Sequence, residues 1–299
     1  MYRKIRKSFF VLSAICFGIG ASTLGYGQNI HPTNFGFVHV EAKSKSNKTI
    51  QKQVISFNSS WKYGKNSKIN SGKAILYKNI NGKNKKYTVC INAGHGTKGG
   101  ESKQTLCHPD GTPKVTGGST KKGAIYATAI ATGMTFTNGV AESQITLKEA
   151  KILKKKLLKA GYNVLMIRES NDVQLDNIAR TLIANQYADC HIALHWDSTA
   201  SNKGAFYIST PEGSYRNMEP VKSNWKKHHQ LGDCLLSGLK KKKVKIFSSG
   251  KMAIDLTQTS YSTIPSIDIE LGDRSSDCSY KNLETIADGI VLGIHSFFQ

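Results

Sequence analysis

The sequence predicts an α/β domain, because segments typical of strands alternate along the chain with segments typical of helices. Residues 163–168 form a continuous apolar run of the kind found in strands buried on both faces. Apolar residues recur at helical spacing over residues 175–183 and 283–294. With 299 residues and 39% hydrophobic content, the chain can bury one substantial core. We therefore expect a single α/β domain.

The N-terminus has the organisation of a secretory signal peptide. Residues 1–7 are rich in lysine and arginine, and an apolar run follows from residue 8 to about residue 24. This run is short for a membrane-spanning helix of about 20 apolar residues. We therefore expect residues 1–42 to contain a leader that is cleaved after Gly27 or after Ala42, so that no stable membrane anchor remains.

Residues 43–86 are expected to form a tether. Lysine, asparagine, serine and glycine dominate this stretch, and its apolar residues are scattered. Such a composition argues against a packed core. A short hairpin is a second possibility, in which residues 74–77 and 87–90 flank the turn pair Asn81-Gly82. The compact domain is expected to cover residues 87–299.

The first candidate site residue is His95. It follows a strand-like run, residues 87–93, and it lies between Gly94 and Gly96. Glycines permit a sharp turn, and the carboxyl edge of a sheet is where α/β folds place their ligands. A lone histidine in a glycine loop is more often a simple turn residue, so the interpretation depends on whether partners exist.

Three further groups provide those partners. A second strand-like run ends at His195, and Glu270 lies on the polar face of the alternating segment 267–271. Glu142 begins a helix and falls on its inward-facing stripe. A carboxylate directed at the core needs a cation, an arginine or a metal beside it. Two histidines and a glutamate are a donor set that zinc prefers.

Six short motifs that contain these residues occur in a fixed order along the chain. They are Asn92-Ala93-Gly94-His95-Gly96, Gly139-Val140-Ala141-Glu142, Met166-Ile167-Arg168, Arg180-Thr181-Leu182-Ile183-Ala184-Asn185, Ala193-Leu194-His195-Trp196-Asp197 and Pro265-Ser266-Ile267-Asp268-Ile269-Glu270-Leu271-Gly272. Together they resemble the motifs of the zinc-dependent N-acetylmuramoyl-L-alanine amidases of the amidase 3 family, which cleave bacterial peptidoglycan. The resemblance extends over about residues 87–299.

This resemblance implies a twisted, largely parallel β-sheet flanked by helices on both faces. It also implies a Zn²⁺ ion held by His95, Glu142 and His195, with an open position at which a water is activated. Glu270 would be the general base that takes the proton of that water. The expected reaction is hydrolysis of the amide bond between N-acetylmuramic acid and L-alanine.

The sequence departs from the family at two places. Asp273-Arg274-Ser275-Ser276 replaces the usual Phe-Leu-Ser-Asn after the catalytic strand, and residues 97–138 form a long insert between the first two metal motifs. We expect the insert to be a loop that lies beside or over the site.

The remaining polar residues of the motifs are interpreted as structural. This group includes Asp268 and His191, as well as Arg168 and Arg180, which we expect to pair with loop carbonyls or carboxylates. In the insert, His108 and Asp110 are loop residues or, less plausibly, substrate contacts. If Cys16 leaves with the leader, five cysteines remain without any Cys-x-x-Cys pair, so no obligatory disulfide framework is expected.

The formal charge of +22 indicates an acidic partner. Nucleic acid is disfavoured because the chain carries an export signal and has no recognisable nucleic-acid module. Anionic cell-wall polymers fit better, held by screened attraction to lysines such as the run 240–243, which by itself is more simply a solvated helix end. We therefore expect a secreted, cell-wall-associated protein with peptidoglycan as its substrate.

Two alternatives remain open on the sequence. A different zinc peptidase of the cell wall would use the same chemistry, although no His-Glu-x-x-His motif occurs. A non-catalytic wall-binding protein on the same fold would normally have lost a ligand or the base, whereas all four positions are filled here.

Overall fold

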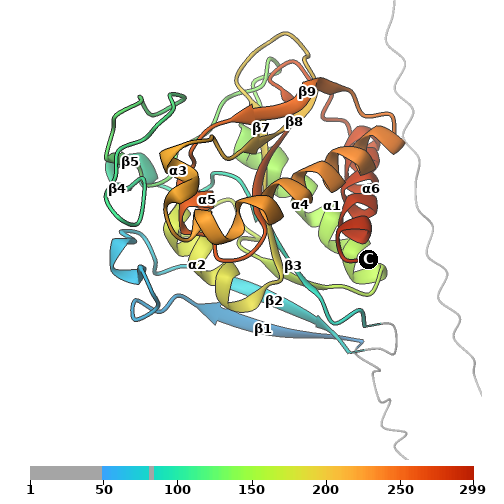
Figure 1. Cartoon of the computed structure of the whole chain (residues 1–299). Coiled ribbons are helices and arrows are strands. Elements are labelled where there is room, and N and C mark those ends of the chain that lie inside the picture. Colours follow the sequence, from blue (N-terminus) through green and yellow to red (C-terminus); the bar gives the residue numbers. More distant parts are fainter. Residues whose placement is uncertain (1–48, 81–83) are drawn as a thin grey trace, which may run out of the picture. The chain divides into compact units, whose positions relative to one another are not determined.

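A computed structural model of the chain describes residues 49–80 and 84–299 (Figure 1). The predicted signal peptide lies outside these residues. The described part contains an eight-stranded sheet, a separate two-stranded sheet and six α-helices. The large sheet has the order β1-β2-β6-β3-β7-β10-β8-β9. Among the helices of the described part, none combines the length and hydropathy needed to cross a bilayer.

The bounds of the elements are as follows. The strands are β1 (Ile50–Ser56), β2 (Lys73–Asn79), β3 (Thr88–Ala93), β4 (Gln104–Leu106), β5 (Tyr126–Thr128), β6 (Asn163–Met166), β7 (Cys190–Asp197), β8 (Ala205–Ser209), β9 (Ile246–Ala253) and β10 (Ser266–Asp273). The α-helices are α1 (Glu142–Lys159), α2 (Asn177–Tyr187), α3 (Ser214–Asn217), α4 (Val221–Lys241), α5 (Thr257–Tyr261) and α6 (Tyr280–Phe297).

The centre of the large sheet is parallel. Strands β6, β3, β7 and β10 run in the same direction, whereas β2 joins β6 and β8 joins β10 in antiparallel pairs. The prediction of a largely parallel sheet is therefore confirmed. Because the carboxyl ends of β3, β7 and β10 meet at one edge, residues that follow these strands are brought together there.

Both faces of the sheet are covered, which explains the continuously apolar strands. Helices α1, α4 and α6 pack on one face, and α2 and α5 lie on the other (Figure 1). In β3, Val89 and Ile91 belong to the core under the first group of helices. Cys90, between them, belongs to the core under α2. Alternation along a strand thus supplies both hydrophobic layers.

The interpretation of residues 43–86 as a tether is wrong for the part that the structure describes. Strand β1 pairs with β2 along its whole length, and β2 pairs with β6, so both belong to the large sheet. The alternative hairpin with residues 87–90 is also wrong, because β3 pairs with β6 and β7. Strand β1 is a mostly exposed edge strand with few apolar residues, and this lowers the apolar density of the stretch.

The insert, residues 97–138, is folded against the rest of the domain through Asp255. It contains the small β4–β5 sheet. The Asp255 carboxylate is fully buried and accepts hydrogen bonds from His108 Nε2 at 3.1 Å and from Lys114 Nζ at 2.9 Å. It also accepts from the backbone N–H of Val115 at 2.6 Å. His108 is therefore an anchor of the loop.

We expect Asp255→Asn to lower the free energy of unfolding by about 3 kcal/mol at pH 7, because it leaves the buried Lys114 ammonium without its carboxylate partner. Urea denaturation measures this loss, and limited proteolysis of the lysine-containing insert reports whether it opens first. Asp110→Asn is the control, since Asp110 is an exposed residue of the same insert. That variant should stay within about 0.5 kcal/mol of wild type.

The loss of stability in Asp255→Asn should depend on pH. Burial alone would raise the pKa of Asp255, but hydrogen bonds from His108, Thr116 and Lys114 outweigh it and hold the pKa well below its usual range. The stabilisation is therefore complete above about pH 3.9 and is lost as the pH falls through the folded-state value. A difference between wild type and Asp255→Asn that persisted undiminished into strong acid would contradict this assignment.

Candidate metal centre

The loop after β3 brings His95 to the parallel edge of the sheet. Gly94 N–H donates to the carbonyl of Leu194 at 3.1 Å, which continues the pairing of β3 with β7. A Cβ atom at Gly94 would lie 2.2 Å from Cε1 of His195, so only glycine allows this approach. His95 itself has φ of 60°, an uncommon value for a residue with a side chain. The predicted sharp turn is therefore present, and the strain falls on the histidine.

Two arginines hold this strained loop. Arg168 donates from Nε to the carbonyl of Ala93 and from Nη2 to that of Gly94, at 2.9 and 2.8 Å. Arg180 donates from Nη2 to the carbonyl of His95 at 2.7 Å. Both side chains are almost fully buried. The prediction that these arginines pair with loop carbonyls is confirmed.

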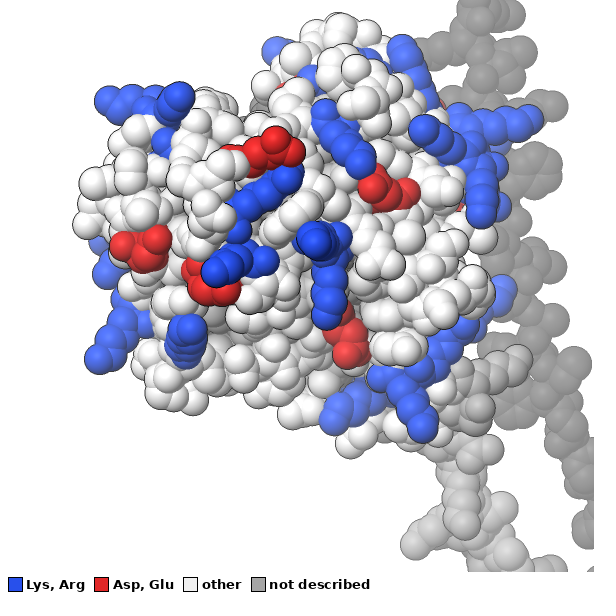
Figure 2. All heavy atoms as spheres, viewed as in Figure 1, with Lys and Arg blue, Asp and Glu red and all other residues white. Residues whose placement is uncertain are grey.

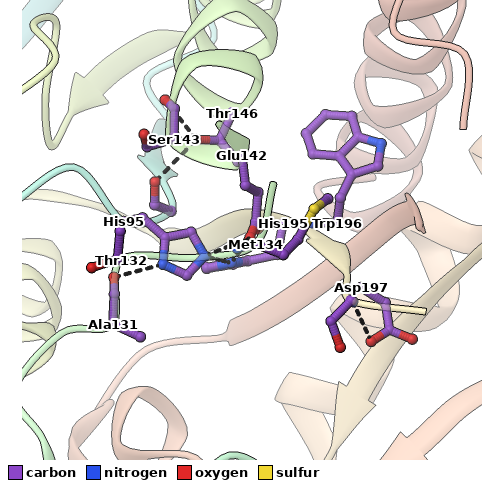
Figure 3. A network of polar contacts seen from close by, with 12 residues as sticks. His95, Ala131, Thr132, Met134, Glu142, Ser143, Thr146, His195, Trp196 and Asp197 are labelled. Atoms are coloured by element: carbon purple, nitrogen blue, oxygen red, sulfur yellow. Dashed lines mark hydrogen bonds and ion pairs between the residues drawn. The ribbon is translucent and has the colours of Figure 1, made fainter. Parts of the chain in front are cut away.

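His95, Glu142 and His195 converge at the edge of the sheet (Figure 3). Nε2 of His95 lies 3.0 Å from Oε2 of Glu142 and 3.0 Å from Nδ1 of His195. The same Nδ1 lies 3.1 Å from Oε1 of Glu142. The structure thus brings together the three residues that the sequence singled out as a donor set.

The protonation of His95 follows from its second ring nitrogen. Nδ1 faces the carbonyl oxygen of Ala131 at 2.8 Å (Figure 3). A carbonyl can only accept, so Nδ1 carries the proton, and in the neutral ring Nε2 presents a lone pair to the cluster. This is the arrangement by which metal-ligating histidines are oriented in proteins.

The geometry of the three donors fits a metal ion. A tetrahedral zinc with bonds of about 2.0–2.1 Å separates its ligand atoms by about 3.3 Å. The two imidazole nitrogens lie 3.0 Å apart, and each lies 3.0–3.1 Å from one oxygen of the Glu142 carboxylate. Positive charge is favoured at this point. Burial alone would lower the pKa of His195, but Asp268 and Glu142 outweigh it and raise the pKa to about 10. A metal cation bound between the donor atoms would be stabilised by the same two carboxylates.

Glu142 is held by the backbone at both oxygens. Its side chain is 3% exposed at the first turn of α1. Oε2 accepts from the N–H of Met134 and Oε1 from that of Trp196, both at 3.0 Å. Burial would raise the pKa of Glu142, but the adjacent His195 and His95 outweigh it and hold the pKa well below its usual range. The carboxylate is thus ionised and fixed in orientation, and it has the partners that its inward position requires.

Glu270 lies on β10 directly beside the cluster. The parallel pairing of β10 with β7 places Glu270 opposite His195. Its Oε2 is buried and has no hydrogen-bond partner among the described residues. The structure assigns it no ion pair, since the nearby Lys203 pairs with Asp197. Burial, and then the charge of Asp268, raise the pKa of Glu270. An unpaired carboxyl group beside a metal-binding cluster can exchange protons with a bound water.

The insert contributes backbone groups that the sequence did not point to. Ala131 orients His95, and the N–H of Met134 holds Glu142 (Figure 3). Between them, Gly133 has φ of 90°, and a Cβ there would lie 2.6 Å from His95 Cδ2 and 2.8 Å from Glu142 Oε2. The only signal in the sequence was a short run of small and apolar residues, 129–134, inside an otherwise polar insert.

The departure at residues 273–276 also has a structural explanation. The carboxylate of Asp273 is fully buried and accepts from the N–H groups of Ser201 and Lys203, at 2.9 and 3.1 Å. Arg274 connects this loop to the insert, because its carbonyl accepts from the N–H of Thr137. Aspartate thus ties the loop after β10 to the loop after β7.

Two other polar groups do not join the cluster. His191 is buried within β7, with Nδ1 3.3 Å from the hydroxyl of Ser266, and burial lowers its pKa to about 3, which keeps it neutral. Asp110 is an exposed loop residue that accepts a hydrogen bond from the N–H of Thr112.

Within the described residues, all five cysteines are free thiols.

Known proteins are similar to this chain in sequence motifs and in fold. Residues 89–296 match the family model described as N-acetylmuramoyl-L-alanine amidase, of the amidase 3 type. A search of curated protein sequences gave no match. The fold is similar to solved N-acetylmuramyl-L-alanine amidases from two mycobacteria. That of Mycobacterium smegmatis has a TM-score of 0.58 and 16% identity, over 71% of this chain and 96% of the other.

The apo form of the amidase from Mycobacterium abscessus has a TM-score of 0.56 and 18% identity, over 71% of this chain and 99% of the other. An N-acetylmuramoyl-L-alanine amidase from Clostridium difficile has a TM-score of 0.50 and 19% identity, over 71% and 96%. These similarities show the fold, and the family model covers well over half of the sequence. The chain belongs to the amidase 3 family of N-acetylmuramoyl-L-alanine amidases.

Proposed function

We propose that this chain is a zinc-dependent amidase that hydrolyses the bond between the lactyl group of N-acetylmuramic acid and the first L-alanine of the stem peptide. One observation carries the proposal most directly. Two imidazole nitrogens lie 3.0 Å apart at the carboxyl edge of the sheet, and each lies 3.0–3.1 Å from one of the two carboxylate oxygens of Glu142. Without a proton or a metal ion between them, the two nitrogen lone pairs would repel each other.

Zinc is the metal that suits these donors best. Imidazole and carboxylate ligands are typical of catalytic zinc sites, which use three protein ligands and keep one position open. Bound at His95, Glu142 and His195, zinc would polarise the scissile carbonyl and lower the pKa of a water from about 15.7 to about 7. The ionised state of Glu142 and the protonated Nδ1 of His95 prepare both residues for this role.

Glu270 is the proposed general base. Its position opposite His195 and its buried, unpartnered oxygen support this role. It would take a proton from the attacking water and deliver it to the nitrogen of the leaving L-alanine, so that the amine departs neutral. A carboxyl group is suited to both transfers because it can accept a proton and release it again within one turnover.

The basic surface supports attachment to the cell wall. Figure 2 shows lysine and arginine side chains spread over the visible face of the molecule, with few acidic side chains between them. The formal charge of the whole chain is +22. We propose that this surface holds the enzyme on anionic wall polymers after export, by attraction that weakens as salt is added.

The alternatives are weaker. A non-catalytic wall-binding protein does not need Glu270, whose burial without a partner costs stability. A peptidase of the stem peptide would use the same metal chemistry, and only the bond that is cut distinguishes it from an amidase.

We expect the wild-type protein to bind about one Zn²⁺ per chain and Gly133→Ala to weaken that binding by at least about tenfold. The added methyl group would collide with His95 and Glu142, and the backbone there has φ of 90°. Elemental analysis and competition with a chromophoric chelator measure the stoichiometry and the affinity.

Gly123→Ala is the matched control. Gly123 lies in the same insert with φ of 83°, but no atom lies within 4 Å of the position of an added Cβ. It should show the same backbone strain and unchanged zinc affinity. Equal affinity in Gly133→Ala and Gly123→Ala would contradict a role for the insert in the metal site.

Glu270→Gln should keep the fold and bound zinc but lower kcat by about 10²- to 10⁴-fold, because the amide cannot accept the proton of the attacking water. Steady-state hydrolysis of a soluble muramyl peptide, together with zinc analysis of the same preparation, tests this. A rate close to wild type in the zinc-loaded variant would place the base elsewhere.

Mass spectrometry of digested peptidoglycan identifies the bond. We expect free stem peptides with new L-alanine amino termini and intact glycan strands. New reducing sugar ends would indicate a glycosidase, and cuts between amino acids of the stem would indicate a peptidase. Repeating the digestion at increasing salt should reduce wall binding while cleavage of soluble fragments continues, since the latter does not require the charged surface.

A further inference from the structure

Asp268 is a carboxylate for which the fold has no evident use. It lies on β10, two residues before Glu270 and on the same face of the strand. Its side chain is 15% exposed, and Oδ1 is buried. The structure assigns Asp268 no hydrogen bond within the described residues. The interpretation of Asp268 as a structural residue therefore lacks the partners that a structural carboxylate normally has.

Among the described residues, the ion-pair partner of Asp268 is His195. Oδ2 of Asp268 lies 3.6 Å from Nε2 of that ring. The other ring nitrogen, Nδ1, lies 3.0–3.1 Å from His95 and Glu142. The imidazole of His195 thus has one nitrogen in the donor set and the other directed at Asp268.

This orientation fixes which nitrogen is available to a metal. A negative charge beside Nε2 favours the proton there, and in the neutral ring the lone pair is then on Nδ1. The opposite tautomer would present N–H to the cluster and could not bind a cation. In His95 the carbonyl of Ala131 fixes the proton on Nδ1 in the same way, which leaves the lone pair on Nε2. Asp268 supplies the corresponding group for His195.

We propose that Asp268 is a positioning residue, whose carboxylate faces Nε2–H of the His195 imidazole at 3.6 Å and keeps Nδ1 directed at the metal. The proposal rests on the proposed zinc site and adds to it a residue that touches neither the metal nor the substrate. It also explains why a buried carboxylate persists between Ile267 and Ile269, whose side chains belong to the core. An apolar residue at position 268 would cost less to bury.

The test compares Asp268→Leu with Asp268→Asn. Both variants remove the charge and keep the number of side-chain heavy atoms, but only asparagine keeps an oxygen that can face Nε2–H. We expect Asp268→Leu to raise the Kd for Zn²⁺ by about 10- to 100-fold. Asp268→Asn should raise it by a smaller factor. Competition with a chromophoric chelator gives these values without any measurement of activity.

The thermal stability of the zinc-free protein separates positioning from structure. For a positioning residue, the zinc-free Asp268→Leu variant should have a Tm equal to or above that of zinc-free wild type, because an unsatisfied buried carboxylate has been removed. A structural role predicts the reverse, a lower Tm in both variants with unchanged zinc affinity of the folded protein. That result would overturn the proposal.

Two further outcomes are informative. Equal losses of zinc affinity in Asp268→Leu and Asp268→Asn would show that only the charge matters, and this would reject the positioning role. Wild-type protein that binds no Zn²⁺ would overturn the proposed zinc site and this inference together. Zinc binding that is normal in wild type and unchanged in Asp268→Leu would overturn the inference alone and leave the proposed function standing.

Discussion

The contact between Gly94 and the imidazole of His195 is the constraint on which the site depends. Strands β3 and β7 are neighbours in the sheet, and their pairing continues as far as the Gly94 N–H. At that point the two chains are so close that no Cβ fits against the ring. Only this approach lets His95, the next residue, meet His195 from the neighbouring strand. The metal centre is thus built by the parallel pairing itself.

A close approach of this kind strains the backbone, and buried arginines stabilise it. The left-handed conformation of His95 is unfavourable for a residue with a side chain. Arg168 and Arg180 donate hydrogen bonds to the carbonyls of Ala93, Gly94 and His95, which offsets the loss of water at these groups. Burial lowers the pKa of Arg168 to about 10 and that of Arg180 to about 9, so both guanidinium groups remain charged at neutral pH. Two charged donors are therefore placed beside a strained residue of the backbone.

The insert and the carboxylates of β10 complete the site from opposite sides. The insert is tied down through Asp255 and, near its far end, orients His95 and Glu142 through backbone groups. Strand β10 brings Asp268 and Glu270 beside His195, and each carboxylate has an oxygen buried without a partner. Such groups oppose folding, and they are most common where a bound ion, water or substrate completes their interactions. The two halves of the site therefore differ, with fully satisfied ligands on one side and unsatisfied acids on the other.

Local pattern in the sequence determined the alternation of strands and helices, the strand ends that bear His95 and His195, and the inward position of Glu142 on its helix. Each of these follows from periodicity or from glycine at a turn, which depend on neighbouring residues only. The membership of β1 and β2 in the sheet was not predicted, because β1 is a mostly exposed edge strand with few apolar residues and the short apolar run of β2 lies in a stretch dominated by polar residues. The roles of Ala131 and Met134 were hidden for another reason, since they act through backbone groups that every residue has. Asp268 was assigned to structure because the family motif gives it no catalytic task, and a strand pattern does not show which groups of the next strand lie opposite. These features were decided by strand register and by the packing of the insert, which depend on contacts between segments that are distant in the sequence.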